Sequence, residues 1–94
     1  MDDGRLRAVL TAVDRGSFSK AAAELGYTQS AMTHLVNNLE AELGCTLLNR
    51  GSHGVRLSEE GEQLLPYIKS VIDACDALRQ EAAAQSRTQR HQLS

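Results

Sequence analysis

Three glycines divide the first half of the chain and limit what it can fold into. Apolar residues recur three or four positions apart before Gly16 and Gly44, and an alanine-rich stretch precedes Gly26. Both patterns are typical of helices, and a glycine directly after such a stretch commonly ends the helix. The sequence therefore predicts three short helices, over residues 4–16, 20–25 and 29–43.

The first and third of these helices each carry one apolar stripe that should face a shared core. The first stripe consists of Leu6, Val9, Leu10 and Val13. The other consists of Met32, Val36, Leu39 and Leu43. We expect Arg5 and Arg7 on the solvent side of the first helix. Hydroxyl side chains accept hydrogen bonds at helix starts, so Ser19 and Thr28 are the predicted caps of the second and third helices.

The face of the third helix that points away from the core is polar and almost uncharged. Its side chains near the helix start are Gln29, Ser30, Thr33, His34 and Asn37. Exposed helices usually carry Lys and Glu, which form helices more readily than Asn or Thr. Amide, hydroxyl and imidazole groups can hydrogen-bond base edges in a major groove. Two short helices followed by such a face indicate a helix-turn-helix, although a plain solvated surface is the alternative reading.

A hairpin and a long helix are expected in the second half of the chain. Residues 45–49 and 55–58 are short extended candidates, and the glycine-containing segment 50–54 between them suits a hairpin tip. Ser58 should cap a final helix over residues 59–85, which leaves residues 86–94 as a polar tail or truncated linker. The predicted fold is mainly α: a winged helix-turn-helix with a two-stranded wing over residues 1–58, then a long linker helix.

The final helix carries an apolar seam that repeats every three or four residues, as in a coiled coil. The seam consists of Leu64, Ile68, Val71, Cys75, Leu78 and Ala82. A domain of this size is too small to cover the whole seam, so we expect it to pair with a second copy. Packing against its own domain is the alternative.

The remaining composition excludes several classes of protein. The 94 residues carry a net charge of −2, with no signal peptide and no apolar run long enough for a membrane crossing, so a cytoplasmic protein without membrane contact is expected. The two cysteines, Cys45 and Cys75, have no neighbouring ligands, so neither a metal site nor a cofactor is expected. No pair of carboxylates or activated nucleophile indicates an enzyme. Three aromatic residues are too few for RNA stacking, whereas a protein-interaction module remains an alternative.

Several motifs together resemble the N-terminal region of LysR-type bacterial transcriptional regulators. The resemblance runs in one register from about Arg5 to Arg79. Its motifs are residues 16–22 (GSFSKAA), Leu25, residues 28–33 (TQSAMT), Leu39-Glu40, residues 42–44 (ELG), Leu47-Leu48, Arg50 and residues 57–61 (LSEEG). The sequence departs from the family pattern at Ser30, where Pro is frequent, and at His34 and His53, where Arg is frequent.

The resemblance implies a DNA-binding role for particular residues. Its base-reading positions fall on Gln29, Ser30, Thr33 and His34, with Asn37 one turn further along. Its phosphate contacts fall on Ser17, Ser19, Lys20, Thr28 and Arg50. Helix 29–43 would lie in the major groove of double-stranded DNA, and the wing tip, with His53, at the minor groove.

The resemblance also implies how copies of the chain assemble. The linker helix would pair antiparallel with its counterpart in a homodimer, which reads an interrupted inverted repeat. A small-molecule effector would act only through a C-terminal domain that is absent from this chain.

The charges of the predicted DNA-binding part cancel. Three acids balance three bases in residues 1–16, and three acids balance three bases in residues 17–57. We therefore expect weak non-specific binding to DNA with a shallow salt dependence.

Overall fold

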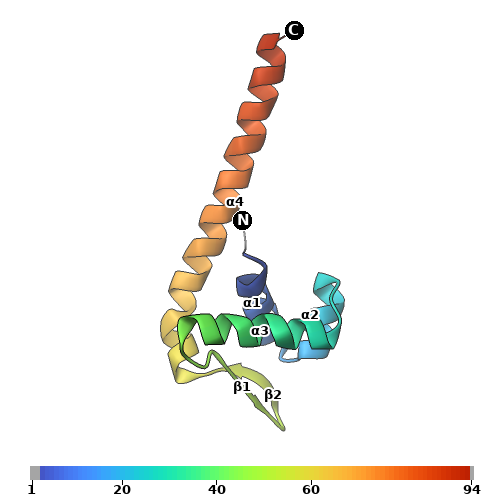
Figure 1. Ribbon diagram of the computed structural model, residues 1–94, viewed down its shortest axis with the longest axis vertical. Helices are drawn as coiled ribbons and strands as arrows, with labels where there is room; N and C mark the ends of the chain where they lie inside the picture. The colour runs from blue at the N-terminus through green and yellow to red at the C-terminus, as the bar shows by residue number, and fades with distance from the viewer. Residues whose placement is uncertain (1–2, 94) are drawn as a thin grey trace.

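The structure is a computed structural model that describes the backbone of residues 3–93 and the side chains of residues 3–86. Three helices, an antiparallel hairpin and a long helix follow one another, which confirms the predicted architecture (Figure 1). Their bounds are α1 Gly4–Arg15, α2 Phe18–Leu25, α3 Gln29–Leu43, β1 Leu48–Gly51, β2 Gly54–Leu57 and α4 Glu59–Leu93. The upper part of α4 stands clear of the other elements, and the wing projects on the opposite side of the molecule (Figure 1).

The predicted helix ends are confirmed. Gly16, Gly26 and Gly44 all adopt the left-handed conformation, with φ of 68°, 79° and 73°, which side chains with a Cβ rarely adopt. Thr28 caps α3 by accepting a hydrogen bond from the N–H of Ala31 at 3.1 Å. The second helix, however, begins two residues earlier than predicted, and Ser17 rather than Ser19 is its cap, accepting from the N–H of Lys20.

The core lies between α1, α2 and α3 and is closed by the wing and the start of α4. Met32, Val36 and Leu39 of α3 are buried as predicted. The predicted burial of Leu43 is wrong, because this side chain is 48% exposed. The expected solvent position of Arg5 and Arg7 is also wrong in part. Both are half-buried, and Arg5 pairs with Glu42 at 2.6 Å. Long side chains can bury their stems while an acidic partner holds the charged end.

The wing is a β-hairpin with a two-residue turn, and Gly51 pairs with Gly54 on either side of that turn. Its first strand starts at Leu48 rather than Cys45, because the N–H groups of Leu47 and Leu48 donate to Oε2 of Glu40, at 2.6 and 3.1 Å. The second strand is tied to the rest of the domain by the N–H of Val55, which donates to the carbonyl of Gly16 at 3.1 Å. The wing is thus held from both α3 and the α1–α2 turn.

The last helix begins where predicted and ends later. Ser58 caps it by accepting from the N–H of Gly61 at 2.9 Å. The backbone then stays helical to Leu93, so the expected helix end near Gln85 is wrong, and residues 86–93 of the expected polar tail or truncated linker continue the helix. Residues 80–93 contain neither glycine nor proline, so no residue in this stretch opposes continuation of the helix.

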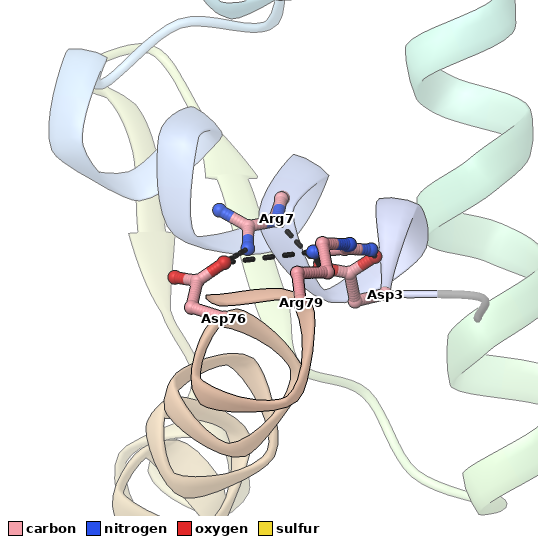
Figure 2. Close-up of polar contacts among 4 residues, drawn as sticks. All are labelled: Asp3, Arg7, Asp76 and Arg79. Atoms are coloured by element: carbon pink, nitrogen blue, oxygen red, sulfur yellow. Dashed lines mark hydrogen bonds and ion pairs between the residues drawn. The ribbon is translucent and has the colours of Figure 1, made fainter. Parts of the chain in front are cut away.

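A cluster of four charged side chains joins α4 to the start of α1 (Figure 2). Arg79 donates to both carboxylate oxygens of Asp3, at 2.7 and 3.1 Å, and Arg7 donates to Asp3 at 2.7 Å and to Asp76 at 2.5 Å. Asp3 is only 5% exposed, so its charge depends on these two guanidinium groups. We call these four residues the Asp3 cluster.

The Asp3 cluster makes stability depend on acidity. Hydrogen bonds from Arg79, and then from Arg7, lower the pKa of Asp3 well below its usual range. A carboxyl with a lowered folded-state pKa stabilises the protein above its unfolded pKa, and this contribution is lost as the pH falls. At about pH 7 we expect wild type to be more stable to unfolding than Asp3→Asn. This difference in the free energy of unfolding should shrink as the pH falls below about 4.

Urea unfolding followed by circular dichroism between about pH 2 and 7 measures this difference. Asp14→Asn, at an exposed acid within α1, is the matched control. A gap between wild type and Asp3→Asn that stays constant at every pH would contradict the assignment.

Candidate nucleic-acid interface

The five predicted base-reading side chains lie together on one exposed surface of α3. A shallow, open depression of about 370 Å³ is lined by Gln29, Ser30, Thr33, His34 and Asn37. All except the half-buried Thr33 are exposed. The opposite side of the helix is anchored by Met32 and Val36, both 0% exposed. The polar surface is therefore held by the core and points away from it.

The start of this surface is connected to α2. The hydroxyl of Ser19 donates to Oε1 of Gln29 at 2.9 Å, so the first turns of the two helices are joined. The hydroxyl oxygens of Ser17 and Thr28, both predicted phosphate contacts, accept from backbone N–H groups as helix caps. Lys20 is exposed in the first turn of α2, close in sequence to both Ser17 and Ser19. Four of the five predicted phosphate contacts thus gather where the starts of α2 and α3 meet.

The fifth predicted phosphate contact, Arg50, lies on the wing and contacts the far end of the same surface. Its Nη2 donates to Oδ1 of Asn37 at 2.9 Å, and its Cζ lies 4.5 Å from the centre of the Phe18 ring. The wing tip, with exposed His53, forms a separate shallow depression lined by residues 49–54, 56 and 57. Arg50 therefore links the wing to α3, while His53 stands apart from α3's depression.

The predicted seam of α4 divides between two faces. Ile68 is 4% exposed and half-buried Leu64 packs beside it, both against the chain's own domain, where Ile72 joins them. Val71 and Leu78 are 46% and 57% exposed, Ala82 is exposed, and Cys75 is half-buried. Packing in cis therefore uses the first part of the predicted seam. An apolar stripe of Tyr67, Val71 and Leu78 remains uncovered in this single chain.

Sequence reasoning missed two residues that shape the interface. Glu40 accepts hydrogen bonds from the backbone N–H groups of Leu47 and Leu48 at the start of the wing. The ring of Phe18 packs against the guanidinium of Arg50. Both lie within the motifs noted above, but only as members of a pattern. Buried backbone N–H groups need hydrogen-bond acceptors, so the segment after Gly44 requires a nearby acceptor, and this requirement could have pointed to Glu40.

Other kinds of site are not found in the part of the chain that the structure describes. No group of three or more His, Cys, Asp or Glu side chains among the described residues could hold a metal ion. No helix there is long and apolar enough to cross a membrane.

Comparison with known proteins agrees with the geometry. A family model described as "Bacterial regulatory helix-turn-helix protein, lysR family" matches residues 4–62. The uncharacterized HTH-type transcriptional regulator YusT of Bacillus subtilis (strain 168) is 42% identical over 76 residues, which cover 81% of this chain and 26% of YusT. The HTH-type transcriptional activator AmpR of Citrobacter freundii is 46% identical over 68 residues, covering 72% of this chain and 23% of AmpR. The chain thus spans about a quarter of these relatives.

Among solved structures, the BenM DBD in complex with benA site 1 DNA superposes with a TM-score of 0.80 and 31% identity, covering 92% of this chain and 97% of that one. Corynebacterium glutamicum OxyR in its oxidized form gives a TM-score of 0.80 at 31% identity, over 85% of this chain and 24% of that one. The lysR family that the model describes is a family of transcriptional regulators and not of enzymes. The matched residues span more than half of the chain, which therefore belongs to the LysR family of bacterial regulatory helix-turn-helix proteins.

Proposed function

We propose that this chain is the DNA-binding part of a cytoplasmic transcriptional regulator and binds a specific double-stranded DNA sequence through α3. The observation that carries the proposal is the exposed surface of α3, on which five uncharged or weakly basic polar side chains line one depression. A major groove about 12 Å wide admits one helix. Side chains that can donate and accept hydrogen bonds are those that distinguish base edges there.

The surroundings of this surface fit a duplex on both sides. The starts of α2 and α3 bring Ser17, Ser19, Lys20 and Thr28 together, and N–H groups and cations at helix starts bind phosphates. The wing carries exposed His53 at its tip, where a neighbouring minor groove would lie. We assign α3 to the major groove and the segment 50–54 to the minor groove.

We also propose that two copies bind together on an interrupted inverted repeat. The stripe of Tyr67, Val71 and Leu78, 70%, 46% and 57% exposed, supports this, because large apolar groups in a row favour burial against a partner. The chain then divides into a winged unit, residues 1–58, and a dimerisation helix from residue 59. In the complete regulator, a small-molecule effector would bind beyond this chain.

The test is a mobility shift with short duplexes taken from the promoter beside the gene, at two salt concentrations. Specific binding predicts one retarded complex that unlabelled promoter DNA displaces and unrelated DNA does not. No shift with any promoter duplex at low salt, together with tolerance of substitutions in α3, would instead favour a protein-interaction module.

Two substitutions should separate base reading from phosphate binding. Thr33→Ala is expected to cost about 1 to 3 kcal/mol of binding free energy at one base pair and to relax the sequence preference there. Lys20→Ala should weaken binding to every sequence alike, because phosphates are the same along a duplex. Affinities for a set of single-base-pair operator variants measure both effects. A uniform loss with Thr33→Ala would remove it from the base-reading set.

A further inference from the structure

Phe18, Asn37 and Arg50 come from three different elements and form one continuous cluster at the edge of the α3 surface. The guanidinium carbon of Arg50 lies 4.5 Å from the centre of the Phe18 ring, and its Nη2 donates to Oδ1 of Asn37 at 2.9 Å. Phe18 is 8% exposed, so the ring is fixed in the core edge. A cation over an aromatic face is attracted to it, and the guanidinium is therefore held from two sides.

The backbone also fixes this arrangement. Arg50 is paired with Val55 across the hairpin, and the N–H of Val55 donates to the carbonyl of Gly16, at 3.1 Å. Gly16 lies two residues before Phe18, so the hairpin that carries Arg50 is attached, through its second strand, close to the ring on which the guanidinium rests. The Arg50 side chain consequently occupies a preformed position rather than searching for Asn37.

The chemistry of the two groups decides which atom Asn37 presents. A guanidinium donates hydrogen bonds and accepts none, whereas an amide has an oxygen at one end and an NH₂ at the other. Oδ1 of Asn37 must therefore face Arg50, and Nδ2 faces away. We infer that Arg50 is a positioning residue for sequence specificity: it fixes the amide of Asn37 so that its N–H donors meet the base edge. This inference rests on the proposed binding of α3 in the major groove.

A fixed donor selects among the bases. In the major groove guanine offers two adjacent acceptors, N7 and O6, while cytosine offers only the N4 donor. An amide that is free to turn would pair with adenine through both its oxygen and its nitrogen. With the oxygen held by Arg50, guanine is the favoured base opposite Asn37, and cytosine is rejected.

Asn37→Asp tests the direction of the amide. Aspartate keeps an oxygen for Arg50 but replaces the N–H donors by an acceptor. Because the added negative charge weakens binding to all DNA, the quantity to measure is the ratio of dissociation constants for cytosine and guanine at one base pair. That base pair is the one at which Asn37→Ala loses preference. Wild type should prefer guanine by roughly 5- to 150-fold, and Asn37→Asp should reverse the order.

Arg50→Lys separates positioning from phosphate binding. Lysine keeps the positive charge but has neither the planar fork nor the stacking surface of arginine. We expect the salt dependence of binding to stay as in wild type while the guanine preference falls towards that of Asn37→Ala. Arg56→Lys, an exposed position opposite Asn49 in the same hairpin, is the matched control and should change neither quantity.

The outcomes distinguish this inference from the proposed function. If Arg50→Lys keeps the full guanine preference, or if Asn37→Ala changes no base pair while Thr33→Ala does, the positioning role is overturned and base reading by α3 stands. If wild type shows no sequence preference at all, the proposed function fails first. Unchanged circular dichroism spectra of the variants confirm that they fold, as expected for two exposed side chains.

Discussion

Replacing Gly61, in the first turn of α4, with alanine is expected to destabilise the fold strongly. A Cβ at this position would lie 2.2 Å from the carbonyl oxygen of Leu47 and 3.1 Å from its carbonyl carbon. Neither atom can move easily, because the N–H of Leu47 donates to Glu40 and its carbonyl accepts from the N–H of Ser58, at 2.8 Å. Overpacking against fixed backbone commonly costs about 1 to 3 kcal/mol, and here the expected loss is about 3 kcal/mol or more.

Urea unfolding followed by circular dichroism measures this loss as a lower midpoint. The matched control is Gly51→Ala in β1, where an added Cβ meets nothing within 4 Å. Equal midpoints for Gly61→Ala and Gly51→Ala would show that α4 can separate from the segment before the wing without cost.

Replacing Leu78 with glutamate is expected to convert dimers into monomers while the winged unit stays folded. Leu78 is 57% exposed in the single chain. A glutamate at this position would therefore keep its charge in water unless a partner covers it. Buried in an apolar interface, the glutamate carboxylate would be costly because it would lose its hydration. Val71→Glu, at a position 46% exposed, should act in the same way.

Sedimentation velocity measures the oligomeric state, and Gln80→Glu, an exposed site on another face of α4, controls for the added charge. Loss of the second copy should lower affinity for an inverted repeat by about 100-fold or more, because the second half-site is then no longer bound as part of one complex. An unchanged dimer in both Leu78→Glu and Val71→Glu would exclude this stripe as the interface.

The features that sequence alone predicted correctly depend on neighbours in the chain. Gly16 and Gly44 end helices for reasons contained within one turn, and Thr28 caps α3 through a residue three positions away. The polar surface of α3 follows from helical periodicity in the same way. These signals are local, so they needed no knowledge of how the helices pack.

The features that sequence did not predict depend on distant contacts. Ser17 and Ser19 are both hydroxyl residues at the start of α2, and only the observed entry of the chain shows which one is the cap. Ile68 fits a coiled-coil repeat as well as it fits the core, and its burial in cis follows from where α4 leaves the wing. The pairing of Asp3 with Arg79 joins residues 76 positions apart, so no spacing rule reveals it.

The Asp3 cluster has a mechanical consequence for the whole molecule. It fastens α4 to the start of α1 through Asp76 and Arg79 (Figure 2). We therefore expect the part of α4 before these residues and the three short helices to move as one piece. The molecule is 59 Å long and only 26 Å across its next dimension. We expect a displacement of the far end of α4 to reach α3 as a tilt, because the Asp3 cluster joins α4 to α1.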